Sequence, residues 1–167
     1  MIAVIQRVRQ ASVTVESQVI AHINRGLVIL LGVAQGDTGR DVSFMVRKIP
    51  RLRVFPNTQG KMTEALQDIN GELLLISQFT LLANIEKGRR PSFEWAAPPE
   101  EARVRYQEIL EQFRALDLSV QAGIFGKPML VSLDNDGPMT LILDSRAGKG
   151  VNVNKVKNPI HQADRHT

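Results

Sequence analysis

The chain has 167 residues, 43% of them hydrophobic, which is enough for one domain with a core of its own. Cysteine is absent, which excludes a disulfide framework, a thiol nucleophile and a Cys-ligated metal. The apolar run at residues 27–34 is far shorter than the roughly 20 residues of a membrane helix, and the N-terminus lacks the charge placement of a signal peptide. We therefore expect a soluble, cytoplasmic protein without a membrane partner.

Charge is distributed unevenly between the body of the chain and its C-terminus. Residues 1–144 hold 16 Lys+Arg and 16 Asp+Glu, and are therefore neutral. Residues 145–167 hold five basic residues and one acid, which gives the entire net charge of +4. We therefore divide the chain into a domain at 1–144 and a basic C-terminal extension at 145–167. A neutral domain is a poor general binder of polyanions such as duplex nucleic acid.

The N-terminal third alternates apolar and polar residues, a pattern typical of strands. Residues 2–9 and 12–16 predict two strands on either side of Gln10-Ala11. Residues 19–23 and 26–34 predict a second hairpin that turns at 24–26. Residues 27–31 are apolar on both faces, so we expect that strand to be central and buried.

Two helices are predicted. The first begins after Asp37 or Thr38 as its cap, and Pro50 should kink or end it near Ile49. The second begins at residues 98–101, where two prolines precede two acids. Its apolar stripe, which we expect to be buried, comprises Ala102, Tyr106, Ile109, Leu110 and Phe113.

The remaining apolar runs predict strands. Residues 72–77 predict a buried strand, and residues 129–134 and 139–144 predict a last hairpin. We therefore predict one α+β domain, a curved or barrel-like, mostly antiparallel sheet with helices packed outside.

Two short segments stand out as candidate site residues. SQFTL at 77–81 places hydroxyl, amide and aromatic groups where the strand at 72–76 ends. NDGPMT at 135–140 contains a Gly-Pro pair, which can fix an unusual backbone direction. Together they predict a site built mostly from backbone groups.

With QRV at 6–8, ASVTV at 11–15, GKM at 60–62 and KGRRPSF at 87–93, the two segments resemble the D-aminoacyl-tRNA deacylase (D-tyrosyl-tRNA deacylase) family. The resemblance covers residues 1–144 in the family's order and spacing. Met139 departs mildly, because the family more often has Val or Phe there. The resemblance implies the predicted fold, a homodimer, and hydrolysis of the ester that joins a D-amino acid to the acceptor end of tRNA, with glycyl-tRNA as a further substrate.

The catalytic residues implied are Ser77, Gln78, Phe79 and Thr80. Thr80 has no adjacent base in sequence, although Lys61, Lys87 or a carboxylate could reach it in space. We favour a hydroxyl that bonds to nearby backbone, and an oxyanion held by the N–H groups of Phe79 and Thr80. In this scheme Ser77 and Gln78 shape the adenosine pocket and the ribose hydroxyl helps to activate water. By residue type alone, core packing is the commoner role for Phe79.

The resemblance implies that Gly137-Pro138 is cis and projects into the partner subunit's pocket, where it rejects L-amino acids. We also place Met139, Arg7 and Phe93 among the substrate-binding residues, and expect Arg7, on the first strand, to brace the Gly-Pro turn. The alternative for Gly137-Pro138 is an ordinary trans turn, and the alternative for Arg7 is a surface side chain.

The basic loop that contains Lys87, Arg89 and Arg90 could bind phosphates of the acceptor end or simply be solvated. Only three histidines are present, and no HxxxH pair exists, so we expect no metal and no cofactor. Two other functions stay open at this point. One is an esterase that uses Thr80 as nucleophile on tRNA or small esters, and the other is a non-catalytic RNA-binding module.

Overall fold

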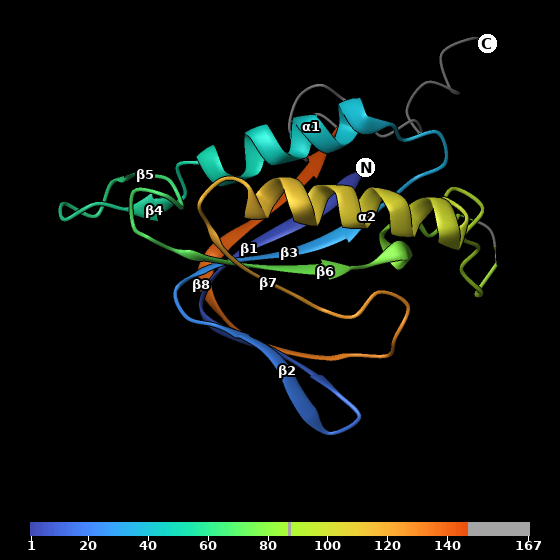
Figure 1. The fold of residues 1–167 in the computed structure, drawn as a ribbon, viewed down its shortest axis with the longest axis horizontal. Coiled ribbons are helices and arrows are strands. Elements are labelled where there is room, and N and C mark those ends of the chain that lie inside the picture. The colour runs from blue at the N-terminus through green and yellow to red at the C-terminus, as the bar shows by residue number, and fades with distance from the viewer. Residues whose placement is uncertain (87, 147–167) are drawn as a thin grey trace, which may run out of the picture.

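The computed structural model describes residues 1–86 and 88–146, and the chain folds into a curved sheet with two helices on one side (Figure 1). The sheet strands are β1 (Ile2–Val15), β2 (Gln18–Ile23), β3 (Gly26–Gly32), β6 (Glu72–Ser77), β7 (Ser119–Ala122) and β8 (Leu130–Asp144). A small hairpin consists of β4 (Phe55–Pro56) and β5 (Met62–Glu64). The helices are α1 (Gly39–Lys48) and α2 (Pro99–Arg114), with short 3-10 turns η1 (Ile49–Arg51) and η2 (Phe79–Leu82).

The sheet has the order β2-β1-β3-β6-β7, and β8 pairs with β1 as well. The pairs that involve β1 are antiparallel, whereas β3-β6 and β6-β7 are parallel. One core lies between the sheet and the two helices, and a second lies inside the curl of β1, β2, β3 and β6. The predicted α+β class with a barrel-like, mostly antiparallel sheet is therefore confirmed.

Local sequence signals define both helices. Thr38 caps α1, and its capping box with Asp41 satisfies the free N–H groups of the first turn. The α-helix ends at Lys48 and continues as a 3-10 turn through Pro50, as predicted. The five predicted stripe residues of α2 are all buried. Strand β3 is central and almost completely buried, also as predicted.

The predicted strand break at Gln10-Ala11 and the hairpin between residues 19–23 and 26–34 are wrong. Strand β1 is continuous, and it forms the hairpin with β2 through Glu16 and Ser17, whose φ angles are 49° and 65°. Strand β3 pairs with the first half of β1 and not with β2. A strand of 14 residues is long enough to hold both neighbours in succession, so β2 and β3 need not pair with each other.

The predicted hairpin at 129–144 is also wrong, because β8 is one strand that pairs with β1 along both halves. Between the pairs Gln6↔Thr140 and Val8↔Asn135, β1 advances two residues and β8 advances five. The three additional residues of β8 form a bulge, and the chain continues in the same direction. The Gly-Pro pair lies in this bulge and does not reverse the chain.

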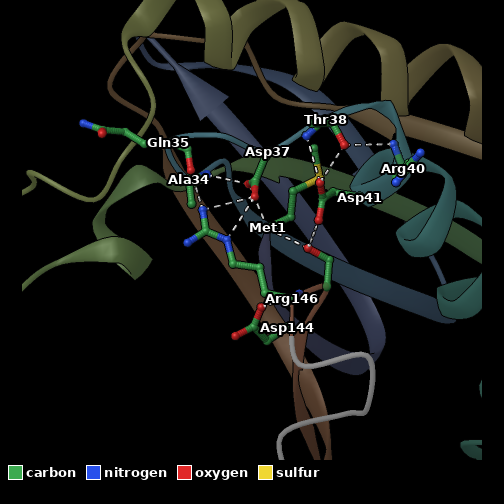
Figure 2. Close-up of polar contacts among 10 residues, drawn as sticks. Met1, Ala34, Gln35, Asp37, Thr38, Arg40, Asp41, Asp144 and Arg146 are labelled. Atoms are coloured by element: carbon green, nitrogen blue, oxygen red, sulfur yellow. Dashed lines mark hydrogen bonds and ion pairs between the residues drawn. The ribbon is translucent and has the colours of Figure 1, made fainter.

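Polar contacts around Met1 tie the end of β8 to the start of α1 (Figure 2). The buried Met1 ammonium lies 2.8 Å from a carboxylate oxygen of Asp37, whose side chain is 1% exposed, and donates to Ser145 Oγ at 2.8 Å. The Ser145 hydroxyl donates to Asp41 at 2.6 Å, and Arg146 lies 3.3 Å from Asp37. Burial alone would raise the pKa of Asp41, but hydrogen bonds from Ser145 and Thr38 and the Met1 charge together hold it below its usual value.

This network fixes residues 33–37, which follow β3 and contribute to the pocket described below. Residues 145 and 146 thus contact the domain, while the rest of the predicted extension, residues 147–167, lies outside the described part of the chain. None of the helices in the described residues is long and apolar enough to cross a membrane.

Candidate functional site

The segment after β6 begins the site. The N–H of Gln78 still bonds to the Leu31 carbonyl of β3 at 2.8 Å, and the chain then turns into η2. Phe79 and Thr80 are the first two residues of η2, where backbone N–H groups have no acceptor inside a helix. Among the described residues, no acceptor is found for either N–H group. Two neighbouring donors are therefore available to a ligand at the end of β6.

A pocket of about 530 Å³ lies beside these donors, within the size range of small-molecule sites. Its floor is formed by β3, β6 and the residues that follow them, and one wall is the first two turns of α2. The walls are mainly apolar, with polar groups from Ser77, Gln78, Gln35 and Tyr106. The lining residues are Leu31, Val33, Gln35, Ser77, Gln78, Phe79, Phe93, Ala96, Ala97, Pro98, Pro99, Ala102, Tyr106, Phe125 and Gly126.

Two phenylalanines stand at this pocket. The rings of Phe79 and Phe93 meet edge to face, with centroids 4.9 Å apart. Phe79 is 57% exposed and Phe93 is 38% exposed, so Phe79 does not have the core-packing role that its residue type favours. An exposed aromatic pair at a pocket of this size offers a flat apolar surface for a ring-shaped ligand.

Thr80 has a side-chain partner but no base. The Gln78 side-chain amide donates a short hydrogen bond to Thr80 Oγ1. Within the described residues, no lysine, histidine or carboxylate is hydrogen-bonded to this hydroxyl, and Lys87 lies outside them. A threonine hydroxyl without a base is a weak nucleophile, so this geometry favours a positioning role for Thr80.

Tyr106 is the pocket's buried titratable group. Its hydroxyl donates to the Leu75 carbonyl at 2.9 Å, and burial raises its pKa well above the ordinary value. The phenol therefore stays protonated at neutral pH and stabilises the wall of the pocket. It does not supply the missing base.

The bulge of β8 is held from inside by Arg7, whose side chain is 8% exposed. Arg7 Nε donates to the Asp136 carbonyl at 3.1 Å and lies 2.9 Å from the Asp136 carboxylate, while its Nη1 donates to the Val54 carbonyl. The Asn135 side chain bonds to the carbonyls of Arg7 at 2.9 Å and Met139 at 3.2 Å. These contacts fix both ends of the bulge, and Arg7 has the bracing position that the sequence suggested.

Gly137 and Pro138 form the exposed tip of this bulge, and the peptide bond between them is cis. Met139 is half-buried against the main core. None of the three is among the described residues that line the pocket. In Figure 1 the bend in the middle of β8 lies near the start of β6, whereas η2 follows the opposite end of β6. The two sequence motifs are therefore well separated within one chain.

Sequence reasoning missed the pocket wall made by Pro98, Pro99 and Ala102, the contribution of Gln35, and the roles of Asn135 and Asp136. Asn135 and Asp136 lie inside the NDGPMT segment. An acidic residue directly before a Gly-Pro pair was the signal in the sequence that could have predicted the buried partner cation, Arg7.

Arg89 and Arg90 of the basic loop are exposed, and Lys87 lies outside the described residues. Within residues 1–86 and 88–146, no group of three His, Asp or Glu side chains is arranged to hold a metal ion.

Comparison with known proteins identifies the family. Residues 4–144 match the model of the family described as D-Tyr-tRNA(Tyr) deacylase. The chain belongs to this deacylase family. Membership places it among the hydrolases that act on an ester bond.

Two relatives and two solved structures illustrate the match. A D-aminoacyl-tRNA deacylase of Sulfurihydrogenibium sp. is 53% identical over 146 residues, 87% of this chain and 99% of the relative. One of Desulfitobacterium hafniense is 50% identical over 143 residues, 86% of this chain and 96% of the relative. A structure described as "c-Myc DNA Unwinding Element Binding Protein" has a TM-score of 0.81 at 43% identity, and covers 86% of this chain and 98% of its own. The structure of a probable eukaryotic D-amino acid tRNA deacylase shares the fold, with a TM-score of 0.72 at 15% identity. The match covers 84% of this chain and 97% of that chain.

Proposed function

We propose that this enzyme hydrolyses the ester of D-aminoacyl-tRNA, and of glycyl-tRNA, in the cytoplasm and so removes wrongly charged amino acids before translation. The observation that carries the proposal is the pair of free N–H groups at Phe79 and Thr80 beside a pocket of about 530 Å³. The family match gives the substrate class, since the relatives are named for it.

The pocket suits the terminal adenosine. Its apolar walls would enclose the base, and the exposed rings of Phe79 and Phe93 offer a stacking surface. Ser77 and Gln78 provide the polar groups for the ribose. The ester carbonyl then lies at the mouth of the pocket, close to the free N–H groups of η2.

The N–H groups would stabilise the oxyanion that forms when water attacks the ester carbonyl, and each such donor is typically worth about 2.7–4 kcal/mol. With no base at Thr80, the ribose hydroxyl next to the ester is the group that assists water. In this mechanism Thr80 positions the first turn of η2 through its bond with Gln78 and forms no covalent intermediate.

Chirality would be controlled by the bulge of a partner subunit. The tip at Gly137-Pro138 is exposed and lies away from its own chain's pocket, which suits insertion into the pocket of a second copy in a homodimer. Its carbonyls would accept hydrogen bonds from the substrate ammonium, with Met139 behind them. One side-chain direction at the α-carbon then points outward and the mirror direction meets backbone, so D-amino acids and glycine are accepted while L-amino acids are rejected.

The direct test is a deacylation assay with matched D-, L- and glycyl-tRNA at enzyme concentrations far below substrate. We expect turnover of the D- and glycyl-esters and none of the L-ester. Equal hydrolysis of D- and L-esters would overturn the proposed chirality control, and no hydrolysis of the D-ester would overturn the proposed function.

Thr80→Ala tests the mechanism. We expect it to keep much of its activity, because its hydroxyl has no base. A loss near a millionfold, the scale of a removed nucleophile, or trapping of an acyl-threonine, would instead establish an esterase that uses Thr80. A tRNA with 2′-deoxyribose at its terminal adenosine, esterified at the 3′ oxygen, should bind normally and react poorly. Unchanged turnover of that substrate would show that the protein supplies the base.

A nucleic-acid-binding role without catalysis is the second candidate, favoured by the structural relative that is named as a DNA-binding protein. Multiple turnovers in the deacylation assay would exclude it.

A further inference from the structure

Besides the basic loop at 87–90, the neutral domain contains a longer basic stretch. Residues 40–61 hold six Lys+Arg and one Asp, so this stretch has a net charge of +5 within a domain whose total is zero. It comprises α1, η1 and the strand β4 with the turn that follows. The six basic residues are Arg40, Arg47, Lys48, Arg51, Arg53 and Lys61. The remainder of the domain must therefore carry the opposite charge, which separates the two signs along the chain.

Four of these side chains, at Arg47, Lys48, Arg51 and Arg53, define what we call the basic face. All four are exposed, and none forms an ion pair within the described residues. The arginines of α2 differ, since two of them pair with glutamates three residues away. The charge of the basic face is thus left for solvent or for a ligand.

A pocket of about 320 Å³ lies on the basic face, between the C-terminal ends of α1 and α2. Its polar groups come from two arginines, two glutamines and one serine, and no carboxylate lines it. The complete lining is Ser43, Val46, Arg47, Pro50, Arg51, Gln67, Gln112 and Leu116. A pocket with two guanidinium groups and two side-chain amides suits a phosphate group, which Arg binds through two parallel N–H donors.

The alternative is that the basic residues only stabilise the end of α1. Cations in the last turn of a helix interact favourably with its dipole, which accounts for Arg47 and Lys48. It does not account for Arg51, which lies beyond the last turn of α1, in η1, and lines the same pocket as Arg47. The shared pocket of Arg47 and Arg51 therefore points to an anion.

The basic face lies at the same end of the molecule as the bulge of β8. Arg53 precedes Val54, whose carbonyl is bonded to Arg7, and Arg7 in turn holds Asp136 next to Gly137. Figure 1 shows the end of α1, the β4-β5 hairpin and the bend of β8 at one end of the sheet, and η2 at the other. If this bulge enters the partner's pocket, as proposed above, the basic face comes close to the tRNA that is bound there.

We infer that the basic face binds phosphates of the tRNA backbone beyond the terminal adenosine, with one phosphate between Arg47 and Arg51. This inference rests on the proposed function, because it takes tRNA as the substrate. It assigns affinity for the body of the tRNA to α1 and η1, and leaves the chemistry to the pocket at η2.

The test is binding of full-length uncharged tRNA, measured by fluorescence anisotropy between about 50 and 200 mM KCl, with wild type and Arg47→Gln/Arg51→Gln. Each lost phosphate contact lowers the slope of log K against log salt by about 0.7–0.9. If two contacts are lost, the ratio of Kd at 200 mM to Kd at 50 mM KCl should be about tenfold smaller for the variant than for wild type. A slope equal to that of wild type would overturn the inference.

Lys127→Gln is the matched control, because Lys127 is an exposed cation that faces Glu16 at 3.6 Å on the β7-β8 loop, away from the basic face. It should bind tRNA with the slope of wild type, and a fall in slope of about 0.7–0.9, half that expected for the double arginine variant, would show a general charge effect and overturn the inference. Far-UV circular dichroism checks folding, and Lys48→Gln/Arg53→Gln removes the other two charges of this group if the first pair does not fold.

Kinetics separate this inference from the proposed function. In Arg47→Gln/Arg51→Gln we expect KM for D-aminoacyl-tRNA to rise with kcat unchanged, and kcat/KM for a D-aminoacyl-adenosine ester, which lacks the stem, to stay at the wild-type value. If wild type fails to hydrolyse D-aminoacyl-tRNA, the proposed function fails while the binding result still stands. If wild type hydrolyses it and the variant binds tRNA like wild type, the inference alone fails.

Discussion

Arg7 offers the sharpest test of how the bulge is held. In Arg7→Met, the buried Val54 carbonyl loses its donor, and among the described residues the Asp136 carboxylate, 29% exposed, keeps only Arg9 at 3.8 Å as a cationic partner. An unsatisfied buried carbonyl costs about 1–3 kcal/mol. Loss of the ion pair adds about 1 kcal/mol, because Asp136 is partly solvated. We therefore expect the free energy of unfolding to fall by about 2–4 kcal/mol.

The assay is thermal unfolding followed by circular dichroism. For a chain of this size, about 2–4 °C of Tm corresponds to 1 kcal/mol, so Tm should fall by about 4–16 °C. Arg9→Met is the matched control, because Arg9 also faces Asp136 but is 80% exposed. Its expected effect is within about 0.5 kcal/mol.

Asp136→Asn in the Arg7→Met background should recover part of the loss, since the unpaired carboxylate is then removed, with a coupling energy of about 0.5–3 kcal/mol. In deacylation assays at temperatures where the variant is folded, discrimination between D- and L-esters should weaken because the bulge is no longer fixed. If Arg7→Met melts within about 2 °C of Arg9→Met, the bracing argument is wrong.

Three further predictions concern stability. The folded pKa of Asp41 lies below the ordinary value of 3.8, so the stabilisation from its carboxylate is fully present above that pH and is lost as pH falls through the folded pKa. In urea unfolding, the free energy of unfolding of wild type should exceed that of Asp41→Asn at about pH 6, and this difference should vanish in strong acid. A chain that ends at Arg146 should have a Tm about 2–12 °C above that of a chain that ends at Asp144, because the shorter chain lacks the Ser145 hydroxyl that accepts from the buried Met1 ammonium. Equal Tm values would place the domain boundary at 144, as the charge pattern suggests. Tyr106→Phe should lose about 1 kcal/mol through its missing bond to β6, with no new pH dependence of kcat near neutral pH, and the appearance of such a dependence would contradict a purely structural phenol.

The helices show what local sequence can determine. The cap at Thr38, the proline at position 50 and the prolines at 98–99 each act on neighbouring backbone, so the helix boundaries follow from a few adjacent residues. The same holds for the burial of residues 27–31, because a strand that is apolar on both faces has to be covered on both. The ordered motifs at 6–8, 11–15, 60–62, 77–81, 87–93 and 135–140 likewise indicated the deacylase family without any knowledge of the fold.

Strand pairing could not be determined in this way. Alternation states which face of a strand is buried, but it does not state which strand lies beside it. The same pattern in residues 2–34 therefore fits two short hairpins or one long β1 that pairs with both β2 and β3, and the structure has the second arrangement. The Gly-Pro pair likewise fits a reversal or a bulge, and the pairing of both halves of β8 with β1 decides for the bulge.

The sequence by itself thus determined the helices, the buried central strand and the family, because each depends on contiguous residues or on motifs in fixed order. Only the tertiary structure decided the pocket, the brace and the basic face. Arg7 and Asp136 are 129 residues apart, and α2 reaches the end of β6 through a long connection, so their contacts arise from the packing of distant segments. A side chain's neighbours across such distances are set by the closure of the whole core, which no local pattern encodes.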